Sequence, residues 1–203
     1  MKGYYFITDE GLSAAGIMHD ASQAIAERVR LIQYRNKSAA TRILFEEALQ
    51  LKRLCAGTST RLIINDRVDI ALAVDADGVH IGQEDLPYAD TRRLVGKNKL
   101  IGVTVHSLEE ARLAESQGAD YLGVSPIFAT GTKPDAGDAC GIETLSAIRR
   151  ACRIPIVAIG GITLNNVADV LAAGANMVCA ISAVITKPDV ADQIRIWQKE
   201  FSL

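Results

Sequence analysis

Two cations follow a glutamine at alternate positions in one stretch of the sequence. The stretch reads IQYRNK and contains Gln33, Arg35 and Lys37. If the chain is extended here, the three side chains share one face, because side chains alternate along a strand. The plain alternative is the solvated end of a basic strand. Two cations that converge on a pocket are better explained by a multiply charged anion.

Acidic residues stand just after two other apolar runs. Asp66 follows the run that ends in Asn65, and Asp85 lies in the turn GQED after the run 78–81. Asp66 could instead cap the next helix, and the second stretch could be only a polar turn. Neighbouring strands lie about 4.8 Å apart. Carboxylates at two such strand ends could therefore share one Mg2+, which takes oxygen ligands at roughly 2.1 Å.

Hydroxyl groups gather in the longest predicted loop, 125–140. The sequence SPIFATGTKPDAG gives Thr130, Thr132 and Lys133 around one glycine. Two hydroxyls and a cation suit an anionic group. A loop of this length in a short chain is usually functional and often acts as a lid.

A glycine pair provides a second candidate for phosphate binding. Gly160 and Gly161 stand between the apolar run IVAI and a predicted helix, where backbone N–H groups can approach an anion closely. Taken alone, the pair is equally consistent with a tight turn. The N–H groups of Ile181 and Ser182, at the end of the last predicted strand, could complete the same site.

No arrangement of Ser, His and Asp, and no general acid and base pair, stands out. His106 follows a predicted strand, and a lone histidine there is more often a structural hydrogen-bonding group than a base. The inventory of anion-binding groups and a carboxylate pair suits departure of a pyrophosphate better than hydrolysis or proton transfer.

Strands and helices that alternate along the chain must position these residues. Strands are predicted at 4–8, 30–35, 61–65, 78–81, 100–104, 121–124, 156–159 and 177–181. Helices are predicted at 20–29, 38–56, 68–74, from near 87 to before Gly96, from the cap Ser107 to Gly118, at 142–151, at 164–173 after the cap Thr163, and at 189–201.

This order predicts a parallel α/β fold. Eight units favour a closed barrel over a doubly wound sheet, and no G-x-G-x-x-G follows any strand. A faint repeat supports the prediction, since ADGV, ADYL and ANMV each lead from a helix into a strand. We therefore expect a single-domain (β/α)8 TIM barrel over residues 1–203. In such barrels chemistry lies where strands end, and phosphate is commonly held after strands 7 and 8.

Composition and charge argue against some classes of binding partner. The net charge of −2 argues against nucleic acid, and no apolar run reaches the roughly 18 residues of a membrane span. The start, MKGYYFITDE, has no apolar core of a signal peptide. The four cysteines are scattered without metal-ligand spacing, which indicates reduced thiols and a cytoplasmic location. We expect small-molecule substrates and no membrane or nucleic-acid partner, and a homo-oligomer is left open.

Several stretches in this order resemble thiamine phosphate synthase over nearly the whole chain. They are IQYRNK, LIINDRVDIALAVDADGVHIGQEDLP, GVTVHSLEEA, ADYLGVSPIFATGTKPDAG and IPIVAIGGITLNNVADVLAAGA. The resemblance implies a (β/α)8 barrel and a transferase. It would couple 4-amino-2-methyl-5-hydroxymethylpyrimidine diphosphate to 4-methyl-5-(2-phosphooxyethyl)thiazole, with thiamine phosphate and pyrophosphate as products. In the implied dissociative mechanism, pyrophosphate leaves first and the thiazole nitrogen captures a pyrimidine-methyl cation.

The resemblance also implies residue roles. Gln33 would contact the pyrimidine and diphosphate region, and Asp66 and Asp85 would bind the Mg2+ cofactor. The pyrophosphate would be held by Arg35, Lys37, Asn65, Thr104 and Lys133. The thiazole phosphate would be held by Thr130, Thr132, Gly161, Ile181 and Ser182.

This sequence departs from the family pattern at three positions. Thr104 replaces a usual Ser, Asn36 a common acid and Ser125 a common Gly, so the fit of the pocket is less defined than the reaction type.

Two other functions stay open. A related thiazole tautomerase would need a proton carrier, such as His106, and no metal carboxylates. A non-catalytic thiamine-phosphate binder could have lost Arg35, Lys37 and Lys133, which are all present.

Overall fold

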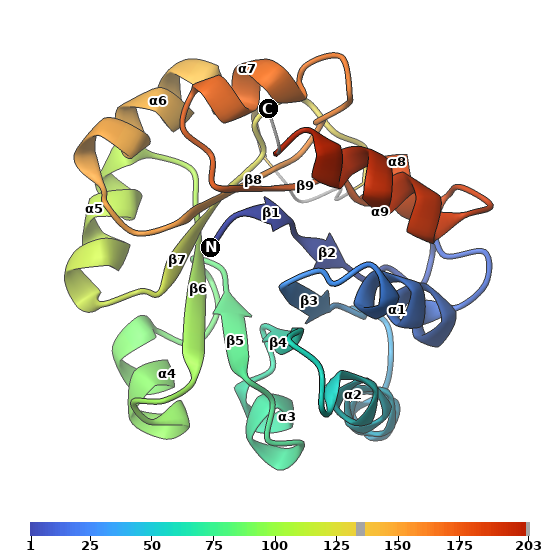
Figure 1. Cartoon of the computed structure of the whole chain (residues 1–203). Helices are drawn as coiled ribbons and strands as arrows, with labels where there is room; N and C mark the ends of the chain where they lie inside the picture. The colour runs from blue at the N-terminus through green and yellow to red at the C-terminus, as the bar shows by residue number, and fades with distance from the viewer. Residues whose placement is uncertain (133–136, 202–203) are drawn as a thin grey trace.

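The computed structural model describes residues 1–132 and 137–201, and its strands form one parallel sheet that closes into a nearly complete barrel (Figure 1). The spatial order is β1-β9-β8-β7-β6-β5-β4-β3-β2. The strands are β1 (Gly3–Tyr4), β2 (Phe6–Ile7), β3 (Leu31–Tyr34), β4 (Arg61–Asn65), β5 (Gly78–Ile81), β6 (Leu100–Val105), β7 (Tyr121–Val124), β8 (Ile156–Ile159) and β9 (Met177–Cys179). The predicted (β/α)8 fold class is confirmed.

The first predicted strand is divided into two segments by Tyr5. Its first half, β1, pairs with β9, and its second half, β2, pairs with β3. The Tyr5 N–H donates to the Val178 carbonyl at 2.9 Å, and the Thr8 N–H donates to the Gln33 carbonyl at 2.9 Å. One extended run thus bonds to both ends of the sheet, which is why eight predicted strands become nine observed segments in the described residues.

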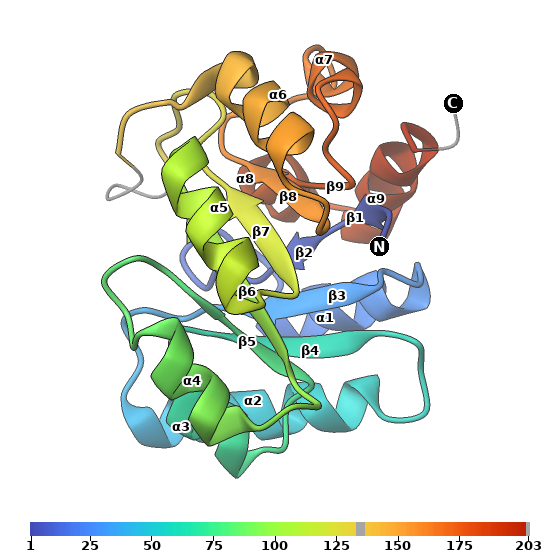
Figure 2. The same cartoon turned by 90° about the vertical axis from the view of Figure 1, so that its left-hand side faces the viewer.

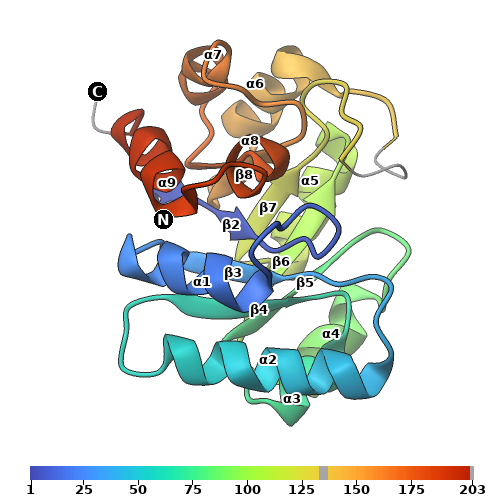
Figure 3. The ribbon, with the colours of Figure 1, turned by 90° about the vertical axis from the view of Figure 1, so that its right-hand side faces the viewer.

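Helices cover the outside of the barrel, and Figures 2 and 3 show them from two sides. They are α1 (Ile17–Ala26), α2 (Thr41–Cys55), α3 (Val68–Ala73), α4 (Tyr88–Val95), α5 (Leu108–Gln117), α6 (Gly141–Ala151), α7 (Val167–Ala172), α8 (Ile181–Ile185) and α9 (Val190–Lys199). The last helix, α9, packs against α1, so the helical layer also closes on itself. Within the described ranges, none of these helices combines the length and apolar character that crossing a membrane requires.

One predicted helix cap is confirmed and another is wrong. The Ser107 hydroxyl accepts the Glu110 N–H at the start of α5. Thr163, in contrast, does not cap α7, which begins after Asn166. The Asn166 side chain instead accepts the Thr163 N–H at 2.8 Å and donates to the Gly161 carbonyl at 3.2 Å. These bonds hold 163–166 in a turn, so the helix starts later than its apolar pattern suggests.

The prediction of a last strand over 177–181 is also wrong at its end. The final residue pair between β8 and β9 joins Ile159 to Cys179, and beyond it the chain has no strand partner. Ile181 and Ser182 begin the short helix α8, which was not predicted.

Each strand alternates between two apolar layers. One layer, enclosed by the strands, contains Tyr5, Ile7, Leu31, Ile63, Tyr121, Val157, Met177 and Cys179. Their strand neighbours, such as Ile32, Leu62 and Leu122, belong to the larger layer between strands and helices. This alternation points every second residue into the barrel. It therefore also fixes which polar residues at strand ends face its mouth.

The repeat of ADGV, ADYL and ANMV corresponds to one recurring set of contacts. In each copy the second residue, Asp77, Asp120 or Asn176, accepts a backbone N–H from the start of the strand beside it. The donors are Leu62, Ile101 and Ile156, at 2.8, 2.8 and 2.9 Å. The same side chains contact a basic residue of a preceding helix, namely Lys52, Arg92 or Arg149. The repeat thus fixes neighbouring strands in register.

We predict that Asp120→Ala lowers the free energy of unfolding by about 1–3 kcal/mol, because the N–H of the fully buried Ile101 loses its acceptor. Asp120→Asn should lose less, since Asn176 fills the same role with an amide oxygen. The part-exposed ion pair with Arg92 contributes little by comparison. Urea unfolding measures both variants, and equal midpoints for Asp120→Ala and the unaltered chain would contradict this account.

Candidate active site

The carboxyl ends of the strands surround a cavity of about 320 Å³. The predicted site residues that the structure describes all line it, although their roles stay predictions. They are Gln33, Arg35, Lys37, Asn65, Asp66, Asp85, Thr104, Thr130, Thr132, Gly161, Ile181 and Ser182. Lys133, the remaining predicted residue, lies outside the described residues. The fold therefore brings to one place groups from the ends of seven strands, β3 to β9, and from the segments that follow them.

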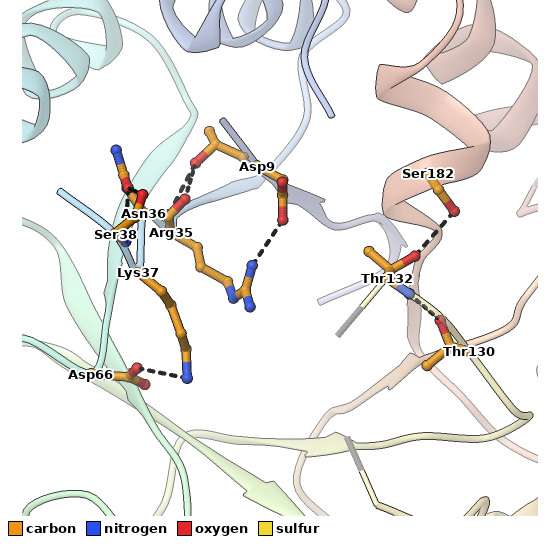
Figure 4. A network of polar contacts seen from close by, with 10 residues as sticks. Asp9, Arg35, Asn36, Lys37, Ser38, Asp66, Thr130, Thr132 and Ser182 are labelled. Atoms are coloured by element: carbon orange, nitrogen blue, oxygen red, sulfur yellow. Dashed lines mark hydrogen bonds and ion pairs between the residues drawn. The ribbon is translucent and has the colours of Figure 1, made fainter. Parts of the chain in front are cut away.

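Arg35 is held in place by the residues that follow β2 (Figure 4). Its guanidinium contacts the Asp9 carboxylate at 2.8 Å, and both side chains are about 15% exposed. The hydroxyl of the buried Thr8 accepts the Arg35 N–H at 2.9 Å and donates to the Arg35 carbonyl at 3.3 Å. A guanidinium has five N–H donors, so others remain for an anion in the cavity.

Lys37 has a looser ionic contact. Its ammonium lies 3.7 Å from the Asp66 carboxylate, and its side chain is 47% exposed. Such an exposed pair is weak and easily exchanged for other partners. The two cations of the predicted anion site thus differ, because the contact of Arg35 with Asp9 is short and part-buried, whereas that of Lys37 with Asp66 is longer and more exposed.

Asp66 does not cap the helix that follows it. The N-cap position of α3 is Arg67, and no side-chain cap bond is formed there. Asp66 has a left-handed backbone, with φ of 59°, and its N–H donates to the His80 carbonyl at 2.8 Å. A non-glycine residue in this region is uncommon and is often associated with a functional site.

Asp85 closes the turn after β5. Its carboxylate accepts the Gly82 N–H at 2.7 Å. Asp85 therefore stabilises a polar turn, as one of the two interpretations of this stretch expected. Within the described ranges there is no group of three or more His, Cys, Asp or Glu residues arranged to hold a metal ion. Two carboxylates alone do not complete the coordination of a hard cation, and substrate oxygens and water are the usual further ligands.

The opposite wall of the cavity carries hydroxyl groups. The Thr132 hydroxyl donates to the Ser182 hydroxyl at 3.2 Å, which joins the loop after β7 to the start of α8 (Figure 4). The Thr132 N–H donates to the Thr130 hydroxyl at 3.2 Å. These neutral donors lie across the cavity from the cations, so the two walls offer different sites for anionic groups.

Packing requires glycine at positions 160 and 161, whether or not a ligand binds beside them. Gly160 and Gly161 have φ of 99° and 63°. A Cβ at Gly160 would lie 2.6 Å from the Pro126 side chain, and one at Gly161 would lie 2.7 Å from the Ala129 carbonyl. Any side chain at these positions would displace the loop after β7. A substitution of Gly161 therefore cannot separate phosphate binding from turn geometry.

The sequence pattern singled out His106, whereas the structure points to His80. The His106 ring contacts the Ser125 carbonyl, and His106 is not among the described residues that line the cavity. His80 lines it, and its two ring nitrogens contact the Tyr121 and Thr104 hydroxyls at 3.0 and 2.8 Å. Its alternation with the outward-facing Val79 and Ile81 is the signal that could have placed it inside the barrel.

The thiol at the base of the cavity is inert. Burial raises the pKa of Cys179 well above the ordinary thiol range, so the group stays protonated at neutral pH. All four cysteines are free thiols.

Comparison with known proteins assigns this arrangement to a family. The family model described as thiamine monophosphate synthase matches residues 4–184. A thiamine-phosphate synthase of Chloroflexus aurantiacus is 54% identical over 193 residues, covering 94% of this chain and 88% of that protein. One of Methanosarcina barkeri is 47% identical over 187 residues, covering 92% and 84%. The structure of thiamine phosphate pyrophosphorylase from Pyrococcus furiosus superposes with a TM-score of 0.90 at 38% identity, covering 98% of this chain and 95% of that chain.

We predict that Arg35→Ala weakens binding of inorganic pyrophosphate by roughly 10- to 150-fold, because hydrogen bonds to charged groups contribute about 1.5–3 kcal/mol. Arg42→Ala is the matched control, since it removes the same charge from the exposed surface of α2. Titration calorimetry measures both. Equal losses in the two variants would show that only net charge matters and would remove Arg35 from the site.

Proposed function

The chain belongs to the thiamine monophosphate synthase family and is a transferase, and from this premise we propose its substrates and mechanism. The substrates are 4-amino-2-methyl-5-hydroxymethylpyrimidine diphosphate and 4-methyl-5-(2-phosphooxyethyl)thiazole, and the products are thiamine phosphate and pyrophosphate. The observation that carries the proposal is one cavity with a cationic wall at β3 and a hydroxyl-lined wall at β7 and α8.

The cationic wall receives the diphosphate. The bond between the pyrimidine methylene carbon and the diphosphate oxygen breaks, and its electron pair leaves with the diphosphate. Arg35 and Lys37 stabilise the charge that develops on this leaving group, with Asn65 and Thr104 as neutral partners and Lys133 as a further cation. Hydrogen-bond donors stabilise developing charge best when they are already held in position before the reaction. The Asp9 carboxylate holds the Arg35 guanidinium in this way.

The hydroxyl wall holds the second substrate. Thr130, Thr132 and Ser182, with the backbone of Gly161 and Ile181, bind the thiazole phosphate and aim the ring nitrogen at the cation left by the pyrimidine. The nitrogen lone pair forms the new C–N bond, and no proton is transferred. Gln33 contacts the pyrimidine. This chemistry requires no general base, in keeping with the position of His106 outside the cavity.

The residues present fit a Mg2+ cofactor. Asp66 and Asp85 follow adjacent strands and both line the cavity, and carboxylates with substrate phosphate oxygens are the ligands that Mg2+ prefers. When bound, Mg2+ neutralises charge on the leaving diphosphate. Asp66 would then bind the ion in place of its contact with the Lys37 ammonium.

We also propose a cytoplasmic location and small-molecule substrates, with no nucleic-acid or membrane partner. The free thiols and the net charge of −2 support this, and self-association is a matter for measurement.

Mass spectrometry after mixing the protein with both substrates and Mg2+ tests the reaction. The proposal expects a thiamine phosphate signal that requires both substrates. Isomerised thiazole phosphate would instead indicate a tautomerase, and binding of thiamine phosphate without turnover would indicate a non-catalytic binder.

We predict that Asp66→Asn and Asp85→Asn each weaken Mg2+ binding in the presence of inorganic pyrophosphate and sharply reduce turnover. Because both act through one ion, the double variant should lose much less than the product of the two single losses. Calorimetry gives a readout independent of activity, and Glu84→Gln is the control, since Glu84 is exposed and does not line the cavity. Full activity in EDTA would contradict the assignment.

A further inference from the structure

Five polar side chains form a continuous chain of contacts across the inside of the barrel. The Gln33 amide nitrogen donates to the Tyr5 hydroxyl at 2.9 Å, and the Tyr5 hydroxyl lies 2.9 Å from that of Tyr121. The Tyr121 hydroxyl lies 3.0 Å from His80 Nδ1, and His80 Nε2 lies 2.8 Å from the Thr104 hydroxyl. The first four residues are at most 4% exposed.

Two glycines make room for this chain. Gly102 on β6 and Gly123 on β7 face the barrel interior beside the His80 and Tyr121 rings, whose centroids are 5.5 Å apart. A Cβ at Gly102 would lie 2.5 Å from His80 Nδ1 and overlap the Tyr121 ring, and one at Gly123 would lie 2.9 Å from His80 Cε1. The absence of side chains at these two positions thus leaves the space that the His80 and Tyr121 rings occupy.

The direction of the hydrogen bonds follows from the Gln33 end. An amide nitrogen only donates, so the Tyr5 oxygen accepts and its proton points to Tyr121. Tyr121 in turn donates to His80 Nδ1, which must therefore be unprotonated. Burial raises the pKa of both tyrosines, so neither loses its proton at neutral pH.

We propose that this chain is a positioning device that fixes His80 with its proton on Nε2 and so turns the Thr104 hydroxyl proton toward an anion in the cavity. His80 Nε2 then donates to the Thr104 oxygen, and the only proton of that hydroxyl is left for a ligand. The inference rests on the proposed function, in which the ligand is the leaving diphosphate. Tyr121 does not line the described part of the cavity and acts only through His80.

Reversed hydrogen bonds along this chain would change what the Thr104 hydroxyl can bind. If His80 carried its proton on Nδ1, it would donate to Tyr121, and the Thr104 hydroxyl would donate to Nε2 instead of to an anion. The Tyr5 and Tyr121 hydroxyls would then each have a proton to donate, but only one of them could donate across the contact between them. One buried O–H would be left without an acceptor, at a cost of about 1–3 kcal/mol. The geometry therefore favours the first direction.

Nitrogen NMR of the imidazole groups in the substrate-free protein tests the direction. His80→Asn assigns the signal against those of His19 and His106. We expect His80 with a protonated Nε2 and a hydrogen-bonded, unprotonated Nδ1. Tyr121→Phe should shift the Nδ1 signal to that of a nitrogen without a hydrogen bond, whereas Tyr5→Phe should not. A proton on Nδ1 in the unaltered protein would overturn the proposal, whether or not either variant folds.

Kinetics test the consequence for the reaction. Tyr121→Phe should lower the single-turnover rate about tenfold, the effect of one hydrogen bond, with KM for the thiazole phosphate unchanged. Tyr88→Phe is the control, because it removes a hydroxyl that donates to the Gly118 carbonyl away from the cavity. An unchanged rate for Tyr121→Phe would overturn the positioning role. Failure of the unaltered protein to form thiamine phosphate would overturn the proposed function, while the NMR result would still decide the direction.

Discussion

The barrel closes at Tyr5, where the first extended segment changes partner from β9 to β3. Without this closure the sheet would have two open edges, and its strand ends would form a row instead of a ring. Closure places the end of β3 opposite the loop after β7 and the start of α8. The placement of the cationic wall across the cavity from the hydroxyl wall depends on it, and the Tyr5 side chain also bonds to Gln33 and Tyr121 inside.

The charged side chains that the structure describes in the cavity are unevenly distributed, since Arg35 and Lys37 lie on one wall. Arg35 is fixed by Asp9, and the contact of Lys37 with Asp66 is longer and more exposed. Among the described residues, the groups on the far side are the neutral hydroxyls of Thr130, Thr132 and Ser182, and we propose that they hold the phosphate of the second substrate. A strongly cationic site on both sides would bind two diphosphates as well as it binds one. We propose that this asymmetry favours one orientation of the two substrates over the other.

Much of this could be predicted from the sequence, because the informative signals are local. Short apolar runs between helical stretches located most strands, and Ser107 and Gly118 bounded α5. The break at Tyr5 and the helix α8 depend on pairing with strands far along the chain. His80 was missed for a similar reason: its apolar neighbours mark it as buried, but only the fold shows that Tyr121 and Thr104 meet it. Asp9 gave no signal at all, because its partner Arg35 is 26 residues away in the sequence.

The central claim is that the cationic wall takes the leaving diphosphate while the hydroxyl wall keeps the phosphate of the product. A crystal structure of the protein with thiamine phosphate, pyrophosphate and Mg2+ tests it most directly. The account predicts pyrophosphate against Arg35 and Lys37, and the phosphate of thiamine phosphate between Thr130, Thr132 and Ser182. The reverse placement of the two groups, or both products on one wall, would contradict it.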